Sequence, residues 1–92
     1  LTTNLEIGNF NHINLNCTVG HDVQFHDYIT VYPGVNISGN VRINDCVEIG
    51  TGTKIIQGKE IVKETVIGAG SVVVKDIVEN GTYIGVPAKQ MK

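Results

Sequence analysis

The sequence contains little cysteine, no cluster of basic residues and no long apolar run. Its seven Lys and Arg residues are scattered among nine acidic ones, for a net charge of −2. Nucleic acid is therefore a poor candidate partner, because neutralising phosphates requires grouped cations. No stretch approaches the ~18 consecutive apolar residues of a membrane span, which argues against membrane insertion. The first residues lack a signal peptide and a starting Met, so Leu1 is expected to lie inside a longer protein.

The two cysteines, Cys17 and Cys46, do not make a disulfide framework. Their separation is not a multiple of the repeat described below, so they are not expected to stack on neighbouring coils. Two thiols suit a reducing compartment, which predicts a cytoplasmic protein. Either thiol could in principle be a nucleophile, but a small core residue at Cys17 and an incidental thiol at Cys46 are the favoured interpretations.

Large apolar residues recur at every sixth position of the chain. Neither the 3.6-residue period of an α-helix nor the two-residue alternation of a strand produces this spacing. Three short strands and three corners would close a coil of 18 residues, with successive coils stacked at ~4.8 Å. The sequence therefore predicts an all-β, parallel β-helix of hexapeptide repeats with about four coils over 1–78, followed by a turn and a short extended tail over 79–92. The first column is Leu1, Ile7, Ile13, Val19, Phe25, Val31, Ile37, Ile43, Ile49, Ile55, Ile61, Ile67 and Val73, and a second column is Cys17, Val23, Ile29, Val35, Val41, Val47 and Thr53.

Gly or Asn often follows the large apolar residue directly, and these types tolerate the strained backbone of a tight corner. The corners are therefore expected at Gly8, Asn14, Gly20, Asn44, Gly50 and Gly68. The pattern weakens over 56–64, where charge density rises, so an irregular or bulging coil is expected there. The repeat then fails at Glu79, and Glu79-Asn80-Gly81 predicts a turn.

One outward position carries residues suited to acid–base chemistry. His21 stands two residues after Val19, and Gly39 follows one coil later. Imidazole, with a reference pKa of about 6.5, suits a general base. Asp22 could orient the ring if a corner brings these adjacent side chains together, and Gly39 could leave an open notch with an accessible N–H for an oxyanion. From spacing alone, a solvated surface histidine remains the simpler explanation.

Four segments carry a resemblance to a known family: 19–23 (Val-Gly-His-Asp-Val), 27–28 (Asp-Tyr), 33–41 (Pro-Gly-Val-Asn-Ile-Ser-Gly-Asn-Val) and 85–89 (Gly-Val-Pro-Ala-Lys). They resemble the sialic acid O-acetyltransferase and UDP-amino-sugar N-acetyltransferase branch of the hexapeptide acyltransferases. The resemblance covers essentially the whole chain. It implies a left-handed coil and a homotrimer. Members of the branch usually carry a nucleotide-binding-like α/β domain before the β-helix, which is absent from this chain.

The resemblance also implies an activity, the direct transfer of an acetyl group from acetyl-CoA to a hydroxyl or amine of a bacterial sugar. In that branch His21 would be the general base, supported by Asp22, and no metal is expected. The acceptor stays open between sialic acid, a nucleotide-linked amino sugar and another sugar. Thr30 falls where some amino-sugar members have a second His, which favours O-acetylation. The positions expected to contact acetyl-CoA are Thr30, Gly39, Thr51, Ala69 and Lys89.

Two alternatives come from other classes of protein. His21 and His26 match the His-x4-His spacing of γ-class carbonic anhydrases, which are also left-handed β-helix trimers with a catalytic metal. The third His of that family would fall before Leu1, and His12 lies only half a coil from His21. A non-catalytic trimerisation scaffold is the other alternative, because stacked repeats provide binding surfaces without catalysis.

Overall fold

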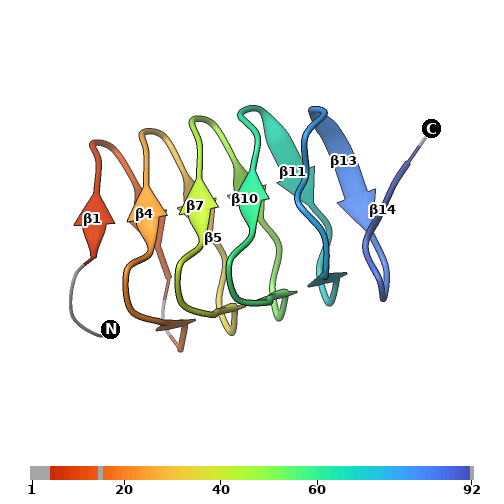
Figure 1. The fold of residues 1–92 in the computed structure, drawn as a ribbon, viewed down its shortest axis with the longest axis horizontal. Helices are drawn as coiled ribbons and strands as arrows, with labels where there is room; N and C mark the ends of the chain where they lie inside the picture. Colours follow the sequence, from red (N-terminus) through yellow and green to blue (C-terminus); the bar gives the residue numbers. More distant parts are fainter. Residues whose placement is uncertain (1–4, 15, 92) are drawn as a thin grey trace.

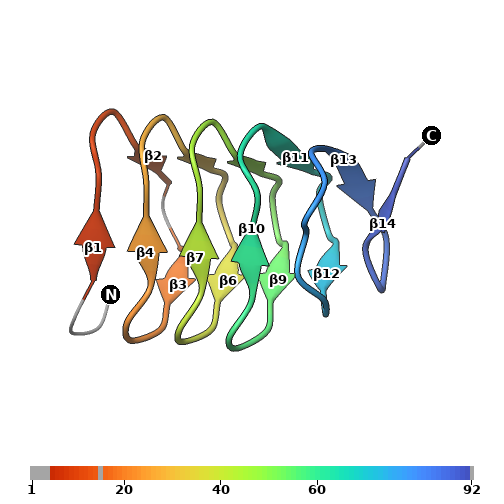
Figure 2. The same ribbon diagram turned by 45° about the horizontal axis from the view of Figure 1, so that its top comes forward.

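The computed structural model describes residues 5–14 and 16–91, and within these ranges it contains strands and turns but no helix. Short parallel strands form the three faces of a prism that coils along its long axis from the N-terminal to the C-terminal end (Figures 1 and 2). The described part of the chain accordingly has no helix long and apolar enough to cross a membrane. Leu1, the first member of the predicted apolar column, lies outside the described residues.

The strands divide among three sheets, here called faces A, B and C. Face A contains β1 (Glu6–Ile7), β4 (Gln24–Phe25), β7 (Arg42–Ile43) and β10 (Glu60–Ile61). Face B contains β2 (His12–Ile13), β5 (Thr30–Val31), β8 (Glu48–Ile49), β11 (Thr65–Ile67), β13 (Gly81–Ile84) and β14 (Lys89–Gln90). Face C contains β3 (Thr18–Val19), β6 (Asn36–Ile37), β9 (Lys54–Ile55) and β12 (Val72–Val73). Glu6 pairs with Gln24 and Gln24 with Arg42, so the predicted 18-residue coil is confirmed.

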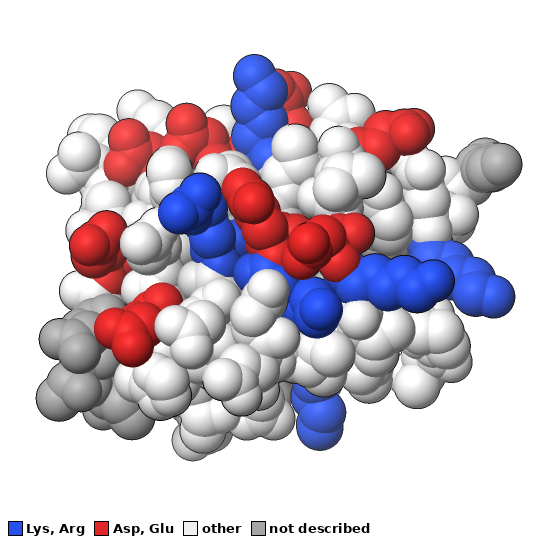
Figure 3. Space-filling view, in the orientation of Figure 1, with Lys and Arg blue, Asp and Glu red and all other residues white. Residues whose placement is uncertain are grey.

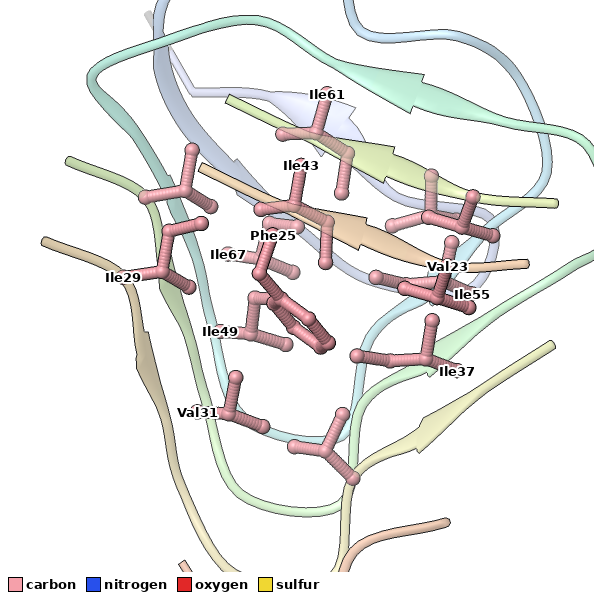
Figure 4. Close-up of a cluster of buried hydrophobic side chains, with 14 of the residues drawn as sticks. Val23, Phe25, Ile29, Val31, Ile37, Ile43, Ile49, Ile55, Ile61 and Ile67 are labelled. Carbon is pink, nitrogen blue, oxygen red and sulfur yellow. The ribbon is translucent and has the colours of Figure 1, made fainter. Parts of the chain in front are cut away.

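From Val19 onward, the apolar residues of both predicted columns are buried in the prism and form one core (Figure 4), whereas Ile7, in the first described coil, is exposed. Ile43, Ile49 and Ile61 are fully buried, and each such side chain contributes about 1.5–3 kcal/mol through the hydrophobic effect. Beyond Val47 the second column becomes polar, but its hydroxyls find acceptors: Thr65 Oγ1 donates to the Val62 carbonyl at 2.8 Å. The fold is thus a parallel β-helix of about four coils, and its left hand stays a prediction.

From residue 10 to residue 70, each corner contains one residue in the left-handed backbone region, and these residues recur at every sixth position. The prediction that the Gly or Asn directly after each apolar residue fills this role is wrong, because the left-handed residue stands two positions further on. Gly20 is required for another reason, since a Cβ there would lie 2.5 Å from the Gly39 nitrogen of the next coil. Asn14 instead donates its side chain to the Val31 carbonyl of the next coil at 2.8 Å. The left-handed residues are Phe10, Asn16, Asp22, Tyr28, Gly34, Asn40, Cys46, Gly52, Gly58, Glu64 and Gly70.

The coil remains regular through 56–64, so the predicted bulge is wrong. Glu60 pairs with Arg42 and Val66 with Glu48, both at the usual spacing of 18 residues. The unbroken inward column holds the coil in register, while the added charges point outward and do not disturb it. Exposed Ile56 shows the same behaviour, because its side chain faces away from the core.

The coil shortens by two residues near its C-terminal end. Ile77 bridges Ile61, 16 positions earlier, and fills the buried column at the place where the period of six fails. The Asp76 carboxylate accepts the Glu60 N–H at 2.9 Å across this change of register. Beyond it, β13 pairs in parallel with β11, and β14 pairs antiparallel with β13.

Candidate active site

The corner between faces C and A, here called the histidine corner, brings His21 and Asp22 together. His21 Nδ1 lies 3.0 Å from Asp22 Oδ2, and the two side chains are 58% and 47% exposed. Adjacent side chains on a strand would point to opposite sides. Asp22 has a φ of 58°, however, and this left-handed turn places its carboxylate beside the imidazole. The pair is therefore an exposed acid–histidine dyad fixed by the local backbone.

Gly39 lies directly beneath His21, one coil further along. The Asn40 N–H donates to the His21 carbonyl at 2.9 Å, which ties the two coils together. A Cβ at position 39 would lie 3.0 Å from His21 Nε2, and Gly39 itself is buried. The predicted open notch is therefore filled by the imidazole. Among the hydrogen bonds of the described residues, none is made by the Gly39 N–H.

The other predicted site residues lie elsewhere on the prism. Thr30 is in β5 on face B, where it pairs with His12 and Glu48. Thr51 and Ala69 are exposed at the corner between faces B and C. Lys89 is in β14, at the C-terminal end of face B. One chain thus gathers only His21, Asp22 and Gly39 at one point, and the width of face C separates this group from the corner of Thr51 and Ala69.

His26 does not share the histidine corner. It is exposed at the corner that follows β4, whereas His21 stands before that strand. Its carbonyl accepts the side-chain amide of Asn11 at 2.7 Å. Within 5–14 and 16–91, no three His, Cys, Asp or Glu side chains gather as metal ligands.

An open groove of about 340 Å³ begins at Asp22 and continues across face A, and the sequence analysis did not single it out. Gln24 and Arg42 line it together with Asp22. The available signal was spacing, because Gln24 and Arg42 are 18 residues apart at outward positions of face A. That spacing alone does not reveal which neighbour the long arginine side chain contacts.

Comparisons with known proteins agree with this fold. No protein-family model matches the chain. A GDP-perosamine N-acetyltransferase of Escherichia coli O157:H7 is 43% identical over 70 residues, which are 76% of this chain and 31% of the relative. A serine acetyltransferase of Bacillus pumilus is 33% identical over 79 residues, covering 77% of this chain and 36% of the relative. The acetyltransferase domain of PglB from Neisseria gonorrhoeae, solved in complex with acetyl coenzyme A, matches with a TM-score of 0.85 and 27% identity over 98% of this chain and 53% of that one.

The coiled prism and its corner dyad define a hexapeptide-repeat β-helix with a candidate acid–base site. With the relatives above, they show that the chain belongs to the hexapeptide-repeat acetyltransferase family. The chain spans about a third of the length of the curated relatives that it matches.

Proposed function

We propose that this chain transfers an acetyl group from acetyl-CoA to a hydroxyl or amino group of a sugar, with His21 as the general base. The observation that carries the proposal is the 3.0 Å contact between His21 Nδ1 and Asp22, which leaves Nε2 at the edge of the dyad beside Gly39. The relative named for GDP-perosamine supports a sugar acceptor, and the PglB domain bound to acetyl coenzyme A supports the donor. A sialic acid or a nucleotide-linked amino sugar fits this class of acceptor.

In this reaction His21 Nε2 takes the proton of the acceptor hydroxyl or amine while the acceptor oxygen or nitrogen attacks the thioester carbonyl. Asp22 keeps the other ring proton on Nδ1 and stabilises the imidazolium that forms. The Gly39 N–H, which has no partner among the described residues, donates to the developing oxyanion. When the carbon–sulfur bond breaks, the imidazolium returns its proton to the departing sulfur. The acetyl group passes directly to the acceptor without an acyl-enzyme.

The positions that the resemblance assigns to acetyl-CoA favour a homotrimer. Thr51 and Ala69 lie across face C from His21, so one chain does not gather these residues at one point. A neighbouring copy that brings its Thr51 and Ala69 corner against the histidine corner would complete the site, with Thr30 and Lys89 on the adjoining face. Analytical ultracentrifugation at micromolar concentration tests this assembly, and a monomer would contradict it. The thiols Cys17 and Cys46, both described, form no disulfide, which is compatible with a cytoplasmic location.

The experiment measures acetyl-CoA binding by calorimetry and acetyl transfer by thiol release, with GDP-perosamine, sialic acid and serine as acceptors. We expect His21→Ala to bind acetyl-CoA normally but to transfer about 10²–10⁴-fold more slowly, because only the proton-transfer group is lost. His26→Ala is the matched control and should keep the wild-type rate. Undiminished transfer by His21→Ala would contradict the assigned base, and transfer to serine alone would contradict the sugar acceptor.

A further inference from the structure

The groove beside Asp22 contains the only arginine of the chain, Arg42. Gln24, Asn40 and Lys59 also line the groove, which crosses face A next to the histidine corner. Basic and acidic side chains lie close together on this face (Figure 3). A volume of about 340 Å³ falls at the small end of the range for small-molecule sites, which suits one sugar ring with its substituents.

Arg42 is held in place without being neutralised. Its Nε donates to Gln24 Oε1 at 3.0 Å, and this contact orients the guanidinium along face A. Among the described residues no carboxylate forms an ion pair with Arg42, although Glu60 is its register neighbour. The Glu60 carboxylate instead accepts the Asn44 side-chain amide at 3.2 Å. The terminal nitrogens of the arginine fork are therefore available to a ligand.

Two acidic residues, Asp22 and Glu60, line the groove, and both have other partners: Glu60 accepts the Asn44 amide and Asp22 contacts His21. The Asp22 carboxylate contacts His21 Nδ1 at 3.0 Å, so its negative charge faces the imidazole. A ligand that enters the groove meets Asp22, whose carboxylate contacts His21, at one end and the unpaired guanidinium of Arg42 on the adjoining strand. A guanidinium fork binds a carboxylate or a phosphate through two parallel hydrogen bonds, and Lys59 adds a second positive charge to the same lining.

We propose that Arg42, positioned by Gln24, is the anion-binding residue of the acceptor subsite. It takes the carboxylate or phosphate oxygens of an acidic acceptor sugar and thereby directs the reacting hydroxyl or amine of that sugar toward His21. This inference rests on the proposed function and narrows its substrate class to anionic acceptors. Neutral sugars lack the group that the arginine fork binds.

A single arginine makes this proposal directly measurable. The side-chain Nε–H of Arg42 gives one resonance in a ¹H–¹⁵N spectrum of the chain, because no other arginine is present. GDP serves as the phosphate probe, N-acetylneuraminate as the carboxylate probe and glucose as the neutral control. We expect a saturable shift of this resonance with at least one anion and none with glucose. A response to GDP assigns a diphosphate acceptor, and a response to N-acetylneuraminate assigns a sugar acid.

Kinetics provide the second readout. Arg42→Ala should raise the acceptor KM about 10- to 100-fold, because a charge-assisted bidentate contact is lost, while the KM for acetyl-CoA stays unchanged. Arg42→Lys should raise the acceptor KM less, because it keeps the charge but loses the fork. Lys63→Ala removes one positive charge at a different corner and is the matched control, for which no change is expected.

Different results would contradict the anion subsite at Arg42 and the proposed acetyltransferase function. A silent Arg42 resonance with both anions, in a chain that still transfers acetyl groups, would overturn the anion subsite and leave the acetyltransferase function in place. An acceptor KM for Arg42→Ala equal to that of Lys63→Ala would have the same meaning. Anion binding at Arg42 without any transfer from acetyl-CoA would support the subsite and contradict the proposed function.

Discussion

Two corners of the same prism hold carboxylates and use them in different ways. At the corner between faces A and B, here called the aspartate corner, Asp27 accepts the Asn9 N–H at 2.7 Å and Asp45 accepts the Asp27 N–H at 2.9 Å. Each carboxylate therefore ties its own coil to the preceding one. At the histidine corner the Asp22 carboxylate contacts a side chain, His21 Nδ1, instead of the backbone.

The backbone is the same at both corners. Asp22 and Tyr28 occupy equivalent left-handed positions, with φ of 58° and 60°. The difference is a shift of the acid by one place within the hexapeptide, because His21 stands where Asp27 and Asp45 stand one and four repeats later. An aspartate at the first of these two positions accepts a backbone N–H of the preceding coil. An aspartate at the second position contacts the side chain of the residue before it. Stability and chemistry should therefore be separable by substituting one corner at a time.

After His21→Ala, the largest effect is expected from Asp22→Asn, which keeps the shape of the side chain but removes its charge. The amide can no longer stabilise the imidazolium, so kcat for acetyl transfer should fall about 10- to 100-fold while the unfolding midpoint stays unchanged. Asp27→Asn makes the same chemical change at the aspartate corner and should keep wild-type activity. Equal loss of activity in both variants would contradict the division between the corners.

Asp27→Ala is expected to reduce stability without reducing activity. This substitution removes the acceptor of the Asn9 N–H, a charge-assisted hydrogen bond between coils, and should lower the free energy of unfolding by about 1–2 kcal/mol. Urea denaturation measures the loss, and hydrogen exchange at Asn9 should accelerate before that of the core strands. Acetyl transfer at low urea should stay unchanged. Unaltered exchange at Asn9 would show that the carboxylate does not hold this coil.

A smaller effect is expected from Gly39→Ala. The added methyl would lie 3.0 Å from His21 Nε2, so the exposed ring must move by a few tenths of an ångström. This displacement should reduce acetyl transfer about three- to tenfold, since catalysis is sensitive to such misplacement, with little change in stability. A shifted His21 ring resonance together with full activity would show that the transfer does not depend on this contact.

The fold was predictable because burial repeats with the coil. Most inward positions are apolar and fit a narrow interior, so the columns through Val31 and Val35 could be read directly. The left-handed positions could not be read in this way, because Tyr28 and Glu64 occupy them as well as glycine. The packing of complete coils sets the backbone there and overrides the intrinsic preference of each residue.

The candidate site was predictable in part. His21 and Asp22 are neighbours in sequence, so only a corner was needed to bring their side chains together. The groove residue Arg42 could not be assigned, because its contact depends on which outward neighbour accepts its Nε. Gln24 and Glu60 are both in register with it, on opposite sides, and the choice between them follows from the side-chain geometry. The sequence therefore predicted the His21–Asp22 pair, whereas the contact of Arg42 with Gln24 required the structure.

The smallest effect is expected at the last corner between faces A and B, which lies between Ile77 and β13. A tyrosine, and not an aspartate, makes the side-chain hydrogen bond there. The Tyr83 hydroxyl donates to the Glu79 carbonyl at 2.7 Å, and burial, followed by the charge of Glu79, raises the pKa of Tyr83 above 10.0. The fold favours the neutral phenol, so this contribution to stability is complete below pH 10.0 and is lost as the pH rises through the raised pKa of the folded state. Urea denaturation between pH 9 and 11.5, with Tyr83→Phe as the comparison, should show a steeper alkaline loss in the wild type, smaller than the effect of Asp27→Ala. Identical slopes would mean that the phenol does not stabilise this corner.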